Sequence, residues 1–120
     1  MLHKDLTEVV IECCLDVIRE LGSGFLESVY EKALLIALAQ KRLRARSQVP
    51  QHVRFRGEVV GDFFADIMIE DKLIVELKAV KTLLPEHQAQ VINYLKATGT
   101  DVGLLVNFGT PKLEVKRLYR

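Results

Sequence analysis

Two stretches near the start of the chain repeat hydrophobic residues at helical spacing. Apolar side chains recur at intervals of three and four over residues 6–21 and again over 26–38, and such intervals mark one face of a helix. Asp5 and Glu8 have the spacing of a capping box at the start of the first stretch. The glycine-containing segment 22–24 interrupts the pattern. We therefore predict two amphipathic helices joined by a short loop, the second continuing to about residue 40.

The middle of the chain changes to an extended, β-branched character. Residues 50–55 predict one strand, and the glycines within 57–61 indicate a turn before a second strand over 63–69. The polar segment 70–72 predicts a tight turn, which leads into a third strand over 73–78. These strands follow one another closely enough to form a three-stranded antiparallel meander.

The last third of the chain returns to a helix and then to strands. Pro85 suits a first helical turn and Gly99 suits the position after a helix end, so a helix is predicted over about 85–98. Residues 102–108 form a nearly continuous apolar run, which is typical of a strand covered on both faces. A strand, helix and strand in this order predict a right-handed crossover to a parallel strand. Residues 113–119 predict a weaker edge strand, and the fold class is mixed α/β (α+β).

Composition limits the class of protein. The chain has 120 residues, of which 49% are hydrophobic and 28% charged, so we expect residues 1–120 to form one domain with its own core. No apolar run is long enough to cross a bilayer and no signal-like segment precedes the first helix, so we expect a cytoplasmic protein without membrane contact. Cys13 and Cys14 are adjacent, and free thiols are expected because a bridge between neighbours would distort the backbone.

The net charge does not by itself identify a nucleic-acid-binding protein. Seventeen basic and sixteen acidic residues give a formal net charge of +1. The cations nevertheless gather in groups: Lys41, Arg42, Arg44 and Arg46; Arg54 and Arg56; Lys112, Lys116, Arg117 and Arg120. These groups fit a phosphate-facing surface, and they fit ordinary solvated charge equally well.

The predicted hairpin brings acidic residues together. If its turn centres on Asp71, Asp66 lies opposite Glu76, with Cβ atoms about 4.5–5.5 Å apart. Side chains alternate along a strand, so Asp66, Glu76 and Lys78 would project from one side. Facing carboxylates destabilise a sheet unless a cation offsets their repulsion, and Mg²⁺ binds one or two carboxylates while keeping several waters. The same alternation also fits a strand with one solvated, charged face.

Asp66 followed by Glu76-Leu77-Lys78 resembles the signature of the PD-(D/E)XK nuclease superfamily. Ala65 stands where that signature has proline, but only the carboxylate would be a ligand. The resemblance implies a restriction-endonuclease-like core, with Asp66 and Glu76 holding Mg²⁺, or Mn²⁺ in its place, and Lys78 assisting catalysis.

Two further motifs resemble branches of that superfamily. Gly24, Glu27 and Tyr30 match the G-x-x-E-x-x-Y string of the GxxExxY family, while Gln90 and Tyr94 are similar to the Q-x-x-x-Y element of RecB-like exonucleases. The resemblance implies that Glu27 completes the acidic site, as a metal ligand or through a bound water, and that Gln90 and Tyr94 position the substrate. An acid is also favoured in any first helical turn, and a tyrosine with one polar partner is an ordinary core residue.

The hypothesis that follows is a metal-dependent nuclease that hydrolyses phosphodiester bonds of DNA, with RNA as the second candidate substrate. Whether the chain is an enzyme stays uncertain from the sequence. A catalytically silent nucleic-acid-binding module and a protein-interaction domain both fit the same pattern. The small size of the chain suggests that a homo-oligomer or a protein partner supplies additional contacts.

Overall fold

A computed structural model describes residues 2–120 and contains three helices and five strands. The elements in chain order are α1 Lys4–Leu21, α2 Glu27–Gln40, β1 Ala45–Phe55, β2 Glu58–Ile69, β3 Leu73–Lys78, α3 Pro85–Thr98, β4 Val102–Asn107 and β5 Glu114–Tyr119. This order confirms the predicted fold class, a mixed α and β architecture with a restriction-endonuclease-like core.

The five strands form one sheet in the order β1-β2-β3-β4-β5. Neighbours are antiparallel except β3 and β4, which pair in parallel with Leu73 opposite Val102 and Lys78 opposite Asn107. Parallel neighbours need a long connection, and α3 provides it, as predicted. The edge strand predicted over 113–119 is β5.

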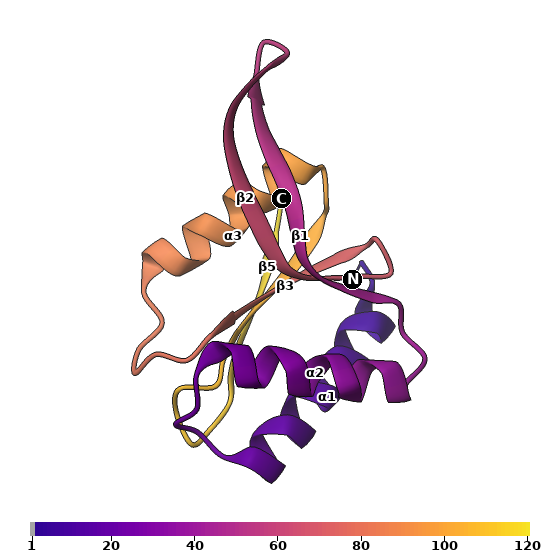
Figure 1. The fold of residues 1–120 in the computed structure, drawn as a ribbon, viewed down its shortest axis with the longest axis vertical. Helices are drawn as coiled ribbons and strands as arrows, with labels where there is room; N and C mark the ends of the chain where they lie inside the picture. The colour runs from indigo at the N-terminus through magenta and orange to yellow at the C-terminus, as the bar shows by residue number, and fades with distance from the viewer. Residues whose placement is uncertain (1) are drawn as a thin grey trace.

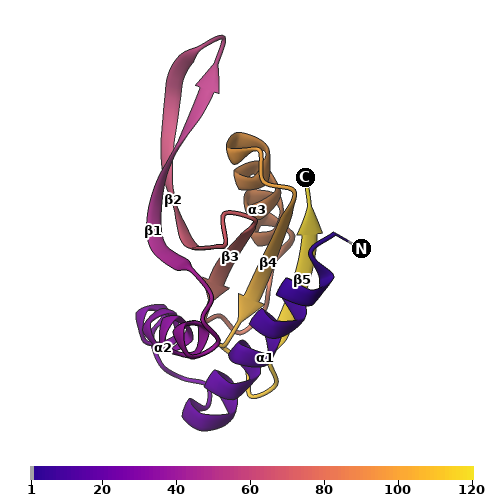
Figure 2. The ribbon, with the colours of Figure 1, turned by 90° about the vertical axis from the view of Figure 1, so that its right-hand side faces the viewer.

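Helices cover both faces of the sheet (Figure 2). On one face, α1 and α2 pack on Ile67, Val75 and Leu104 in the larger hydrophobic cluster. On the other face, Val91 and Leu95 of α3 pack on a smaller cluster. The central strands β3 and β4 are therefore buried on both sides, which accounts for the continuous apolar run in β4.

The start of α1 differs from the prediction. The helix begins at Lys4, and the residue preceding it is His3, which has a φ of 55° and makes no side-chain capping bond. The backbone N–H of Thr7 donates to the His3 carbonyl, so Asp5 and Glu8 already lie inside the helix. The predicted capping box is wrong because its acceptor residue is helical.

The β1–β2 hairpin is longer than predicted, and its outer part projects beyond the rest of the molecule (Figure 1). The chain reverses at Arg56 and Gly57, whose φ angles are 49° and 82°. Gly61 lies within β2 opposite Val53 instead of in a turn. We call residues 50–64 the arm. None of the helices in the described part of the chain is long and apolar enough to cross a membrane.

Candidate active site

The β2–β3 hairpin has the predicted register. Ile69 pairs with Leu73 and Ile67 with Val75. Residues 70–72 connect the two strands; Glu70 and Asp71 each have a φ of 54°, as the central residues of a type I′ turn do, and the Lys72 N–H donates to the Ile69 carbonyl at 3.0 Å. This register, continued by one residue, places Asp66 across from Glu76.

The paired ladder ends at Ile67, and two carboxylates take over as hydrogen-bond acceptors. The backbone N–H of Asp66 donates to Glu76 Oε1 at 3.1 Å, and the backbone N–H of Leu77 donates to Asp66 Oδ2 at 2.9 Å. Each acidic side chain thus satisfies an amide on the neighbouring strand. Buried amides need such partners, so β2 separates from β3 at this point without leaving donors unpaired.

The two acidic side chains also lie where β1 and β2 exchange faces. Ile67 packs in the cluster under α1 and α2, whereas Ala65, two residues earlier, packs in the cluster under α3. In β1, Gln48 interrupts the strand with a φ of 50°, opposite Asp66. The regular alternation assumed in the sequence prediction therefore does not continue through Asp66, which lies at the boundary between the two faces.

Glu76 is buried, with 5% of its surface exposed. The pKa of its carboxyl is raised from 4.5 to about 8, chiefly by burial and then by the charge and carboxyl group of Asp66, while the hydrogen bond from the Asp66 N–H and the charge of Lys78 lower it. Each of the two carboxyl groups accepts a backbone N–H from the strand that carries the other, so the two face each other across the hairpin. Glu76 therefore does not lie on a solvated face, which was the alternative that the alternation of Glu76, Leu77 and Lys78 left open.

A pocket of about 190 Å³ opens beside Asp66 and brings in residues of α2 and β1. Its lining consists of Glu27, Ser28, Glu31, Gln48, Asp66 and Leu77. Glu27, the first residue of α2, is an exposed residue of this pocket, while Tyr30 on the next turn of the helix is fully buried. The resemblance thus selected a residue that does lie in the same pocket as Asp66.

Two residues of this pocket were not singled out from the sequence. Glu31 follows Glu27 by four residues on the same helix, and this spacing was a usable signal. The Gln48 side-chain amide donates to Glu31 Oε1 at 2.9 Å and, more weakly, to Asp66 Oδ1 at 3.4 Å. Nothing in the sequence around Gln48 indicated its left-handed backbone, which directs the amide between the two acids.

The glycine and tyrosine of the G-x-x-E-x-x-Y string hold the loop before α2. Gly24 has a φ of 113°, a value that side chains rarely allow. The Tyr30 hydroxyl donates to the Gly22 carbonyl at 2.6 Å and accepts from the Phe25 N–H at 3.1 Å. Its ring stacks on Phe108 with centroids 4.7 Å apart. Tyr30 is therefore a core residue with a satisfied polar tip, as expected.

Tyr94 connects α3 to the acidic pair. Its ring stacks on Phe63 of the arm, with centroids 3.9 Å apart. Burial raises the pKa of its hydroxyl, as do the charges of Glu76 and Asp66, whereas a hydrogen bond with Gln90 lowers it. Gln90 and Tyr94 thus lie together on the side of α3 that approaches the carboxylates. His87 Nδ1 accepts a hydrogen bond from the Leu84 N–H at the start of α3.

Two arginines near the β2–β3 turn form ion pairs with acidic residues of that turn. Arg44 pairs with Glu70 at 2.8 Å, and Arg46 pairs with Asp71 at 2.6 Å. Both ion pairs lie at the β2–β3 turn instead of at the Asp66–Glu76 end of the hairpin. For these two residues the prediction of a phosphate-facing surface is therefore not supported.

The described residues, 2–120, contain no cluster of three or more histidine, cysteine or acidic residues placed to hold a metal ion. The centre is thus a pair of carboxylates that face each other across the β2–β3 hairpin, with two further acids, Glu27 and Glu31, in the pocket beside Asp66. Hard divalent cations accept one or two carboxylates with the remaining positions filled by water, so the pair meets the minimum for such an ion.

Comparisons with known proteins bear on the fold and the family of this chain. The crystal structure of SSO0001 matches with a TM-score of 0.61 and 22% sequence identity, over 78% of this chain and 49% of that one. The chain spans about half the length of that protein, and the likeness concerns the fold. None of the curated proteins matches the sequence. The family model of the PD-(D/E)XK nuclease superfamily matches residues 4–118. The chain therefore belongs to the PD-(D/E)XK nuclease superfamily, whose members generally use divalent metal ions.

Proposed function

We propose that the protein is a Mg²⁺-dependent nuclease that hydrolyses phosphodiester bonds of DNA, and that Asp66, Glu76 and Lys78 form its catalytic centre. Mn²⁺ is the second candidate metal, and RNA is the second candidate substrate. The family match supports a nuclease. The proposal also keeps the finer assignment to the GxxExxY family, on Gly24, Glu27 and Tyr30.

The observation that carries the proposal is that the Asp66 and Glu76 carboxylates face each other across the β2–β3 hairpin, each accepting a backbone N–H from the opposite strand. Two carboxylates held together in a buried place repel one another, and one of them is protonated near neutral pH unless a cation is present. Oxygen ligands at this spacing suit a hard divalent cation. The residues present therefore fit the metal that the family uses.

A bound divalent cation would offset the negative charge that builds up on the phosphate and lower the pKa of a bound water. The chain contributes positioning. Two backbone amides fix the orientation of the carboxylates, and the Gln48 amide restrains Asp66 from the pocket side. Lys78 lies close enough to Glu76 to lower its pKa, so its ammonium group is placed to stabilise charge on a phosphate oxygen.

The remaining predicted residues take supporting roles in this proposal. Glu27 lies at the mouth of the pocket and is assigned to the metal through a water, with Glu31 beside it. Gln90 and Tyr94 are assigned to the substrate strand, because they lie on the α3 side of the acidic pair.

A second candidate function is a nucleic-acid-binding module that kept the fold without turnover. The observation that favours it is that both carboxylates already accept backbone hydrogen bonds, so the acids have a structural purpose even without a metal. The two functions differ in whether the protein hydrolyses nucleic acid, and therefore in whether Lys78 has a catalytic role.

The test is cleavage of labelled single- and double-stranded DNA and RNA with Mg²⁺, Mn²⁺ or EDTA, using wild type, Asp66→Asn and Lys78→Ala. Wild type is expected to cleave only with a divalent ion. Lys78→Ala should lower kcat by on the order of 100-fold, the usual effect of removing one group that stabilises transition-state charge. Circular dichroism of each variant checks that the fold is kept.

The matched control is Lys72→Ala, which removes an exposed lysine beside the β2–β3 turn. It should cleave like wild type. If Lys78→Ala and Asp66→Asn cleave as fast as the control, the catalytic assignment is wrong. Metal binding in the absence of cleavage by the wild type would favour the second candidate.

A further inference from the structure

A groove of about 580 Å³ runs between the arm and α3. The arm contributes His52, Val53 and Arg54, and α3 contributes Asn93, Tyr94 and Lys96. Figure 1 shows the arm rising beside α3, with the groove's two walls coming from segments far apart in the sequence. None of these residues except Tyr94 belongs to the motifs discussed above.

Two cations from opposite walls meet at this groove without neutralising partners. Arg54 and Lys96 are exposed, and within residues 2–120 neither forms an ion pair, unlike Arg44, Arg46 and Arg120. Of the two acids of the arm, Asp62 is bound to His52 at 2.5 Å, and Glu58, opposite Phe55, forms no ion pair with either cation among residues 2–120. The groove therefore presents uncompensated positive charge, which attracts a polyanion.

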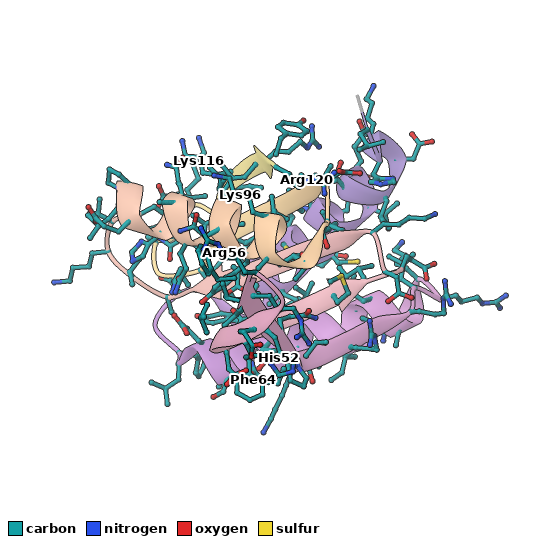
Figure 3. All side chains as sticks on the ribbon, turned by 90° about the horizontal axis from the view of Figure 1, so that it is seen from above. His52, Arg56, Phe64, Lys96, Lys116 and Arg120 are labelled. Carbon is teal, nitrogen blue, oxygen red and sulfur yellow. The ribbon has the colours of Figure 1, made fainter. Side chains whose placement is uncertain are left out.

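The arm also carries an exposed aromatic residue, Phe55, which directly follows Arg54 in the chain. Phe55 is 57% exposed, and the guanidinium of Arg56 lies 4.8 Å from its ring centroid. Figure 3 views the molecule along the arm and shows Arg56 and Lys96 among the side chains on that end of the protein. A charged groove with neighbouring aromatic side chains is the usual combination for binding an unpaired nucleic-acid strand, since bases stack on the rings and phosphates contact the cations.

One residue that lines the groove lies near the acidic pair. Tyr94 lines the groove, and the charges of Glu76 and Asp66 raise the pKa of its hydroxyl. The stack of Phe63 on Tyr94 fixes the arm to α3 at this inner end. A strand held by Arg54 and Lys96 would thus run toward the carboxylates. A volume of about 580 Å³ is that of a pocket for one drug-sized ligand, which suits the individual nucleotides of one strand.

We infer that the groove between the arm and α3 binds a single, unpaired strand of nucleic acid and delivers it to the Asp66–Glu76 site, with Arg54 and Lys96 holding its phosphates and Phe55 stacking on a base. This inference rests on the proposed nuclease function, because it names the form of nucleic acid that the same site receives. The expected substrates are single strands, overhangs or flaps of DNA or RNA, in preference to intact duplex.

The test measures binding without cleavage. Fluorescence anisotropy in EDTA follows a labelled strand of about 16 nucleotides, as DNA and as RNA, and the same DNA as a duplex. The double variant Arg54→Ala/Lys96→Ala should bind the strand at least tenfold more weakly. Its slope of log affinity against log salt should fall by about 1.4, since each phosphate contact on a single strand contributes about 0.7. Phe55→Ala should weaken binding about tenfold.

The matched control is Arg19→Ala/Lys32→Ala, which removes one exposed arginine and one exposed lysine from α1 and α2. It should bind within twofold of wild type. Equal losses in both double variants, no binding by wild type, or tighter binding of the duplex would each overturn the inference.

Cleavage separates this inference from the proposed function. If the groove variants bind normally while Lys78→Ala abolishes cleavage, the nuclease assignment stands and the groove assignment is wrong. If wild type binds through the groove but does not cleave with Mg²⁺ or Mn²⁺, the groove assignment stands and the nuclease assignment is wrong. Where both hold, the groove variants should raise KM and leave kcat near the wild-type value.

Discussion

The buried position of Glu76 makes a quantitative prediction for the metal-free protein: Glu76→Gln should be more stable than wild type at neutral pH. Burial and Asp66 raise the pKa of the Glu76 carboxyl to about 8 in the folded protein, against 4.5 in the unfolded chain. The folded state therefore holds this proton more tightly. The contribution to stability is fully present below pH 4.5 and is lost as the pH rises toward 8.

The size of the effect follows from the same values. Between pH 4.5 and pH 7 the unfolded chain gives up the proton while the folded chain largely retains it. Each pH unit in that interval is worth 1.36 kcal/mol, so wild type loses about 3 kcal/mol from this group by pH 7. Glutamine is neutral throughout and keeps the carbonyl oxygen that accepts from the Asp66 N–H, so the variant avoids this loss.

Urea unfolding in EDTA at pH 5 and pH 7.5 measures the difference. The variant should gain stability over wild type mainly at the higher pH. Glu58→Gln, the same change at an exposed position, should show no comparable gain. Equal stability of Glu76→Gln and wild type at pH 7.5 would refute the argument from burial. Adding Mg²⁺ should stabilise wild type, because a cation favours the ionised pair, and should leave Glu76→Gln nearly unchanged.

Three further predictions concern the frame around the site. Tyr30→Phe should cost about 1–3 kcal/mol in urea unfolding, because it leaves the buried partners of the hydroxyl unsatisfied; a loss below a few tenths would contradict the contacts described. Gly109→Ala should be strongly destabilising, because its Cβ would meet the Val80 carbonyl oxygen at 2.1 Å, whereas Gly61→Ala, whose Cβ would have its nearest neighbour at 3.8 Å, should be tolerated within about 1 kcal/mol. Burial raises the pKa of the Cys14 thiol to about 12, so a thiol reagent should label it at pH 8 only at the rate of unfolding, and fast labelling of native protein would show that it is accessible.

The helices and strands were largely predictable because their hydrophobic periods are long and regular. The β2–β3 register followed from the polar turn around Asp71, and it placed Asp66 across from Glu76. Side-chain alternation failed at Asp66, since that rule assumes a continuous strand and the backbone of Gln48 interrupts β1 opposite it. A left-handed glutamine has no local sequence signal.

The candidate site was predictable only in part for a related reason. Motif spacing identified Glu27, and the pocket does contain it. Its exposure was not predictable, because burial near a helix start depends on where neighbouring strands end. The groove was also not foreseen, since Arg54 and Lys96 are 42 positions apart in the chain and only the projecting hairpin brings them to one surface.

The use of Asp66 and Glu76 as acceptors for strand amides has a consequence for how relatives of this protein should be judged. A relative without nuclease activity would still need both acids, because they accept the amide hydrogens where β2 separates from β3. The presence of the two acids in a relative is therefore no evidence that it is active. Lys78 carries no such obligation: among residues 2–120 its side chain takes part in no hydrogen bond or ion pair. In relatives that have lost nuclease activity, we therefore expect Lys78 to be replaced more often than Asp66 or Glu76.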